Sequence, residues 1–337
     1  MIAKPLLGEL HKKLCVKRLH AAELGVKRLS RVAKSLENFA RHHDIRFSFY
    51  MVAKTDHAVI SFFDQVFDSF LNPAVRWDHY NTPLRYPLLL KLAILFDEET
   101  AKSAWTARVE ANAAVANAAL QKVYAKLLER IHILPDERSR NLISDALNWA
   151  ARNPDEISYH AGNKDIALQI SPSLVGFQQV LAGIAMQSLK QSRKVREIVV
   201  DRQSEFNHAQ DELAQVYRHM TGIKQSMGPG MPEFDMRNMP AASPKFLSSE
   251  ESAGLELVDV VLWVAQRDSD GKTISNELLN MLGAFAKRGQ TDEVSLAGLD
   301  RRWSFLANLP APDTPISEDL QTLLDKLEGE RIEAAKI

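Results

Sequence analysis

Residues 196–207 constrain the fold most, because they read as a short buried strand that ends in a carboxylate and turns into a helix. Residues 198–200, Ile-Val-Val, are consecutive and β-branched, which favours a central strand buried on both faces. Asp201 follows at the carboxyl end, the edge of an open α/β sheet where ligands and metals bind. Ser204 can cap the next helix, with Glu205 in its first turn. This stretch predicts an α/β fold with an acidic side chain at the functional edge of a sheet.

Residues 254–265 read as a second important element, a helix in which Glu256 and Asp259 interrupt an otherwise apolar run. If Asp259 faces inward, a proton, a basic partner or a metal must neutralise it, because an isolated buried carboxylate is very costly. Glu256, Asp259, Gln266 and Arg267 also fall near one side of a helical wheel. Asp259 can therefore equally belong to a solvated face.

Asp201 and Asp259, with Glu205 or Glu9 as a third member, would form a cluster of hard oxygen ligands. Such a set suits Mg²⁺ or Mn²⁺, and two such ions can activate a water and stabilise the leaving oxygen of a phosphodiester. The alternative for Asp201 is structural, since strand-end aspartates often cap the following helix.

The charge of the chain is unevenly distributed. Its 337 residues carry a net charge of -1, yet residues 1–50 contain eleven Lys and Arg against four Asp and Glu. A basic N-terminal helix beside a carboxylate site would let a nucleic acid bind through its phosphates. The commoner interpretation is a solvated basic face that needs no nucleic acid.

Cys15 is the single cysteine, which excludes an internal disulfide and is typical of a reducing compartment. The first residues lack the apolar run of a signal peptide, and no segment approaches a membrane span. The sequence therefore predicts a cytoplasmic protein without membrane contact.

Periodicity and punctuation predict the remaining elements. Helices are expected over 12–43 with a kink at Gly25, over 57–70, 88–96, 100–131, 137–151, 172–190, 204–220, 274–287 and 316–335. Strands are expected over 46–53, 166–170, 198–200 and 245–248. The Gly- and Pro-rich residues 221–243 favour a flexible loop. The predicted organisation is one domain over 1–270, with a helical insertion at about 83–152, and a C-terminal helical extension over 271–337.

Among the histidines, His79 lies in the aromatic and polar sequence Trp-Asp-His-Tyr-Asn. A hydrogen bond in a packed corner explains it more simply than catalysis does. No nucleophile elbow, Walker loop, dinucleotide fingerprint or zinc spacing occurs in the chain.

Four segments together resemble a known family. They are Val-Ala-Lys at 52–54 with Phe-Phe-Asp-Gln-Val-Phe-Asp at 62–68, Trp-Asp-His-Tyr-Asn-Thr-Pro-Leu-Arg at 77–85, Val-Asp-Arg-Gln-Ser-Glu-Phe at 200–206, and Gly-Leu-Glu-Leu-Val-Asp-Val-Val-Leu-Trp at 254–263. In this order they are similar to the ribonuclease-H-like family of the domain of unknown function 3800. The resemblance implies a mixed sheet flanked by helices, with carboxylates at one edge holding divalent metal for phosphodiester cleavage. Asp201 and Asp259 match the later acidic residues of that family.

The sequence departs from the family at its start. Members usually open with a strand that carries an Ile-Asp-Glu-Ser-Gly-like motif and supplies the central metal ligand, and nothing before Glu9 resembles it. The resemblance thus implies a truncated chain or one that has lost its first metal ligand. A missing strand would leave an open edge beside residues 46–53, which would invite pairing in a homo-oligomer.

Two functions follow as hypotheses. The first is a nuclease-like protein with Asp201 and Asp259 as metal ligands, Glu205 as a third ligand or base, and Mg²⁺ or Mn²⁺ as cofactor. The alternative is a non-catalytic binding or assembly module that uses the long helices of residues 83–152.

Overall fold

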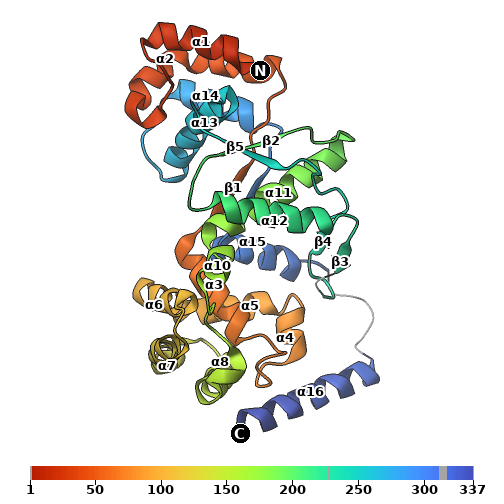
Figure 1. Cartoon of the computed structure of the whole chain (residues 1–337). Helices are drawn as coiled ribbons and strands as arrows, with labels where there is room; N and C mark the ends of the chain where they lie inside the picture. Colours follow the sequence, from red (N-terminus) through yellow and green to blue (C-terminus); the bar gives the residue numbers. More distant parts are fainter. Residues whose placement is uncertain (1, 227, 311–316, 337) are drawn as a thin grey trace. The chain divides into compact units, whose positions relative to one another are not determined.

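The computed structural model describes residues 2–226, 228–310 and 317–336. These residues form mostly helices, and their strands are only three or four residues long. The strands make separate two-stranded sheets, β1–β6, β2–β5 and β3–β4 (Figure 1). The predicted α/β, ribonuclease-H-like mixed sheet flanked by helices is therefore wrong, since the described ranges contain no sheet wider than two strands.

Strand β2 (Ile198–Asp201) shows why the prediction failed. The strand forms as expected, but only Ile198 is buried, and Asp201 is exposed. Strand β2 pairs in parallel with β5 (Pro244–Leu247), and α12 (Asn207–His219) lies in the connection between them. Consecutive β-branched residues favour extended backbone, but a central strand also needs a partner along its second edge. In this chain the helices bury most of the apolar side chains instead.

The chain divides into two compact units, each assembled from three stretches of sequence. Unit 1 comprises residues 1–50, 177–221 and 238–292. Unit 2 comprises residues 51–176, 222–237 and 293–337. The boundary passes through β1 (Phe49–Val52) and β6 (Thr291–Val294).

Unit 1 has a helical core. Its helices are α1 (Ala3–Leu14), α2 (Ala21–His42), most of α11 (Pro172–Gln191), α12, α13 (Ala253–Ser269) and α14 (Asn276–Ala286). Apolar residues recur along α2 at three- and four-residue steps, so Leu29, Val32 and Leu36 share one fully buried face that packs with α13 and α14. The helix predicted over 12–43 is in fact two, α1 and α2. The kink predicted at Gly25 is confirmed, since its φ of 64° is one that glycine adopts at little cost.

Unit 2 is also mainly helical. Its helices are α3 (Lys54–Val66), α4 (Trp77–Asn81), α5 (Arg85–Ile94), α6 (Glu98–Val109), α7 (Ala113–Glu129), the short 3₁₀ helix η1 (Ile131–Ile133), α8 (Glu137–Arg152), α9 (Pro154–Ile157), α10 (Lys164–Gln169), α15 (Leu296–Ala307) and α16 (Glu318–Lys336). The Phe62 ring of α3 lies at the centre of the core, where it contacts the rings of Phe96, Tyr124 and Tyr159.

Side-chain caps explain two local differences from prediction. The single helix expected over 100–131 is broken, because the Asn112 side chain caps α7 by accepting from the backbone N–H groups of Ala114 and Val115. The strand expected over 166–170 is wrong, because the Asn163 side chain accepts from the N–H of Ile166 and starts α10.

The remaining segments follow the sequence more closely. Residues 221–243 are not wholly irregular, since β3 (Lys224–Ser226) and β4 (Glu233–Asp235) form an antiparallel hairpin. Met227 in that segment, and Ile316 at the start of the expected last helix, lie outside the described residues. The expected helix is otherwise α16. Within the described ranges, no helix is both long and apolar enough to cross a membrane.

Candidate functional site

The predicted ligands of β2 are at the surface. Asp201 ends the strand and is exposed, and its backbone oxygen accepts from the side-chain amide of Asn207 at 3.3 Å. Glu205 is exposed in the turn before α12. Ser204 does not cap this helix as predicted, because α12 begins at Asn207 and its N-cap residue is Phe206. Asp201 therefore lies where the sequence placed it, at a strand end, but without the deep sheet edge expected around it.

Asp259 lies on α13 and is half-buried. The α13 side chains that enter the core of unit 1 include Val260, Val261 and Val264, whereas Val258 and Leu262 are exposed. On a helical wheel Asp259 falls beside Leu262 and Gln266, away from the core-facing residues. This position favours the solvated interpretation of Asp259 over the inward one.

The three carboxylates do not fit the proposed metal. Asp201, Glu205 and Asp259 come from a strand, a turn and a helix, and two of them are exposed. Across residues 2–226, 228–310 and 317–336, no group of three or more His, Cys, Asp or Glu is placed to hold a metal ion. Cleavage with two divalent ions needs such a shared ligand set. Mg²⁺ or Mn²⁺ binding at Asp201 and Asp259 thus stays a prediction, and no catalytic step follows from it.

Glu256 is the acidic residue of α13 that does enter the interior, with 5% of its surface exposed. One carboxylate oxygen accepts from Nε2 of His11 at 2.5 Å and from the backbone N–H of Leu19 at 2.6 Å. These bonds join α13 to α1 and to the segment that follows α1. The sequence placed Glu256 near the same side of the helix as Asp259 and left open whether that side is solvated; nothing in the spacing identified His11 as its partner.

Cations gather on the outer side of α1 and α2. Lys13 Nζ donates to the backbone oxygen of Arg31 at 3.1 Å, and Arg28 donates to that of Leu14 at 2.6 Å, so the end of α1 lies against the middle of α2. We define the basic face as Lys12, Lys13, Lys17, Lys27, Arg28 and Arg31. Among the described residues, none of these six forms an ion pair with a carboxylate. By contrast, Lys34 and Arg41 of α2 both pair with Glu37.

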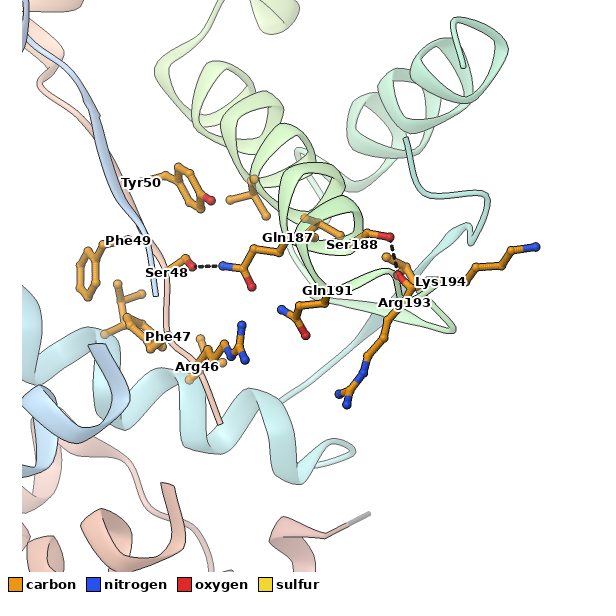
Figure 2. A pocket seen from close by; sticks show the side chains of 16 residues that line it. Arg46, Phe47, Ser48, Phe49, Tyr50, Gln187, Ser188, Gln191, Arg193 and Lys194 are labelled. Carbon is orange, nitrogen blue, oxygen red and sulfur yellow. Dashed lines mark hydrogen bonds between the residues drawn. The ribbon is translucent and has the colours of Figure 1, made fainter. Parts of the chain in front are cut away.

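A cavity of about 710 Å³ lies wholly within unit 1, between residues 46–50, the second half of α11 and one side of α13. Figure 2 shows how alternation along residues 46–50 builds one wall. The side chains of Arg46, Ser48 and Tyr50 point toward α11. The rings of Phe47 and Phe49 lie on the other side of the segment and pack together, with 4.9 Å between their ring centroids. The side chains of this strand therefore alternate, with the polar ones on the side that faces α11 and the two Phe rings on the other.

Hydrogen bonds hold that wall in place. The Ser48 hydroxyl accepts from the side-chain amide of Gln187 at 2.8 Å and from the backbone N–H of Gln290 at 3.1 Å. Tyr50 lies directly over Gly183 of α11, where any Cβ would overlap its hydroxyl, so glycine is required for this close approach. Burial raises the pKa of Tyr50 above its usual value, which keeps its hydroxyl neutral.

The cavity is cationic at its rim. Arg46, Arg193 and Lys194 are among its 16 lining residues, and none of the 16 is Asp or Glu. Arg46 also pairs with Asp44 at 3.2 Å, outside the cavity lining. In Figure 2 Arg46 extends toward Gln191 and Arg193, while Lys194 extends away from them. The sequence alone did not single out Arg193, Gln187 or Gln191; the available sign was the four-residue spacing of Gln187 and Gln191 along α11.

His79 is buried in unit 2, as expected for a packed corner, while the predicted hydrogen bond of its ring is not seen among the described residues. It is buried, and this burial lowers its pKa from 6.5 to about 4. The adjacent Asp78 is held by Arg76 at 2.5 Å. His79 is therefore neutral near neutral pH and largely shielded from solvent.

Comparison with known proteins adds no relative to these observations: no protein-family model, curated protein or solved structure matches the chain.

Proposed function

We propose that this protein is a non-catalytic binding module that holds nucleic acid by its phosphates on the basic face of α1 and α2. The observation that carries the proposal is that the six cations of the basic face, all within residues 12–31, have no carboxylate partner in the described parts of the chain. Two backbone contacts, of Lys13 with Arg31 and of Arg28 with Leu14, bring the end of α1 against α2. Unpaired Lys and Arg side chains on a rigid surface bind phosphates and release the counterions condensed on the polymer. From the sequence alone, such a partner was the less common of two interpretations of this basic segment.

The helices of residues 83–152 are a weaker choice of binding surface. Several of their cations are already engaged, since Lys91 pairs with Asp136 at 2.7 Å and Lys126 with Glu99 at 2.9 Å. Arg130 likewise pairs with Asp97. A cation that is already paired gains less from a phosphate, because it must first give up its carboxylate.

A nucleic acid fits the basic face better than a lipid surface does. Helices that bind membranes insert a continuous apolar face beside their cations. The apolar faces of α1 and α2 are buried in the core of unit 1. Among the described residues up to His42, the large apolar side chain that is exposed is that of Ile2, at 58%. The face thus offers charge without an apolar anchor.

The test is binding of labelled single- and double-stranded DNA and RNA oligomers, measured by fluorescence anisotropy at several KCl concentrations. The variant Lys12→Glu/Lys17→Glu/Lys27→Glu changes three exposed members of the face. We expect at least a roughly tenfold loss of affinity. The slope of log affinity against log KCl concentration should become less steep by about 3, one for each lost phosphate contact.

The matched control is Lys102→Glu/Lys122→Glu/Lys164→Glu, which makes the same charge change at three exposed lysines of unit 2 that form no ion pair among the described residues. We expect it to bind nearly as the unchanged protein does. Equal losses in both triple variants, no binding at all, or binding to anionic vesicles alone would overturn the proposal. Cleavage of the oligomers with Mg²⁺ or Mn²⁺ that is lost in Asp201→Asn would instead support the nuclease hypothesis.

A further inference from the structure

The cavity of unit 1 has the properties of a small-molecule site. Its volume of about 710 Å³ lies within the range of roughly 300–1,000 Å³ that such sites occupy. Its wall at residues 46–50 is fixed by the bonds of Ser48 and by the contact of Tyr50 with Gly183. A ligand would therefore enter a formed cavity and would not have to order the wall on binding.

The charge of the lining selects an anion. Arg46 and Arg193 extend into one region of the cavity in Figure 2, and none of the lining residues is Asp or Glu. Arg193 forms no ion pair among the described residues, whereas Arg46 shares its charge with Asp44, which lies outside the lining. Gln191 reaches the same region, and its side-chain amide donates to no described residue. Guanidinium and amide donors arranged in this way suit a phosphate or carboxylate group.

The opposite part of the lining is apolar. Val180 and Ile184 come from α11, and Val258 and Leu262 come from α13. Val258 and Leu262 are 43% and 46% exposed, although their neighbours on α13 are buried. Covering these side chains would remove apolar surface from water, so the site favours a ligand with an apolar or aromatic body.

We propose that this cavity binds a small organic anion, with its anionic group between Arg46 and Arg193 and its apolar body against α11 and α13. The anion can be a phosphate, as in a mononucleotide, or a carboxylate, as in a medium-chain fatty acid. None of the cavity residues belongs to the basic face, so this site goes beyond the proposed nucleic-acid surface and does not depend on it.

Titration calorimetry of the full chain tests the proposal with AMP, octanoate, adenosine and inorganic phosphate. We expect AMP or octanoate to bind at least roughly tenfold more tightly than adenosine and inorganic phosphate, because only the first two combine an anion with an apolar body. AMP binding alone would identify a phosphate ligand, and octanoate binding alone a carboxylate ligand. Binding of neither, or equal binding of AMP and adenosine, would overturn the proposal.

Two matched variants locate the site. Arg193→Gln removes a lining cation and is expected to lower the affinity for the probe that binds roughly tenfold. Arg196→Gln makes the same change at an exposed arginine outside the lining and should leave this affinity unchanged. Both positions are exposed, so both variants should fold. Equal losses in the two variants would exclude this cavity. Arg193→Gln should leave oligomer binding unchanged, which separates this result from that for the basic face.

Discussion

Two groups of cations, one in each unit, are used in opposite ways. In unit 2, Arg76 and Arg331 have side chains 9% and 5% exposed, and both are held by carboxylates. In unit 1, the cations of the basic face are exposed, except for the half-buried Arg28, and form no ion pairs within the described residues. A positive charge that is buried must be paired, whereas an exposed one is free to meet a partner. The comparison teaches that charge indicates a binding surface only where folding leaves it unpaired.

In unit 2 the paired charges attach the last helix. Arg331 of α16 bonds Asp145 of α8 at 2.7 Å and Glu328 at 2.9 Å, and Arg76 reaches the same Glu328 at 3.3 Å. Arg331 is buried, whereas Leu320 and Leu323 of the same helix are exposed. The helix is therefore held more by ion pairs than by apolar contact.

The largest expected effect concerns the titration of His79 in unit 2. Burial lowers its pKa to about 4 in the folded protein, against 6.5 for an imidazole in water. Between these values the unfolded chain binds a proton that the folded chain does not, so the free energy of unfolding falls as the pH drops from 6.5 to 4. We expect a loss of about 3 kcal/mol from this residue across the window.

Urea unfolding followed by tryptophan fluorescence measures this loss, because four of the five tryptophans lie in unit 2. His79→Leu should reduce the change in the free energy of unfolding between pH 6.5 and 4. Part of the slope should remain, because burial also lowers the pKa of His57. An unchanged slope in His79→Leu would show that the imidazole is not held neutral, which would break this half of the comparison.

The next effect tests whether the ion pairs hold α16. Arg331→Met leaves Asp145 and Glu328 without this partner, and we expect the free energy of unfolding to fall by about 2–3 kcal/mol. This is below the cost for a fully buried pair, since side chains of Asp145 and Glu328 remain 33% and 26% exposed. As a control, Lys336→Met removes an exposed pair with Glu333 and should cost less than about 0.5 kcal/mol. Equal costs would mean that burial of Arg331 contributes nothing to the docking.

The smallest effect sharpens the comparison from the side of unit 1, where Glu256 is a buried charge with a specific partner. Glu256→Gln weakens the bond to His11 and should lower the free energy of unfolding by about 1–2 kcal/mol, measured by urea unfolding with circular dichroism. Glu250→Gln is the control, because that side chain is 78% exposed and its ion pair with Arg18 is long, at 3.9 Å, so its loss should cost little. A control loss as large as that of Glu256→Gln would contradict the role of burial.

The sequence predicted local structure better than it predicted the site. Helical spacing located α2, α13, α14 and most of α16, and the β-branched run located β2. Two failures were local, at the caps Asn112 and Asn163, but those that concern the sheet and the site were non-local. Whether β2 is a central strand depends on strands elsewhere in the chain. The mixed sheet was implied by the family resemblance, and the periodicity of single segments cannot show how strands pair. Glu256 and Asp259 show the same limit, since helical spacing placed both on one solvated side and the contact with α1 buries only Glu256.

By itself, the sequence determined where most helices form and that the first fifty residues are strongly basic, because spacing and charge are properties of neighbouring positions. The tertiary structure decided which charges are paired and that Arg46, Ser48 and Tyr50 meet α11 across a cavity. The bond of Ser48 with Gln187 and the pair of Asp145 with Arg331 join residues more than one hundred positions apart. Such contacts depend on which apolar surfaces pack together. Because the hydrophobic effect is not directional, the local sequence does not specify which distant segment an apolar face will pack against.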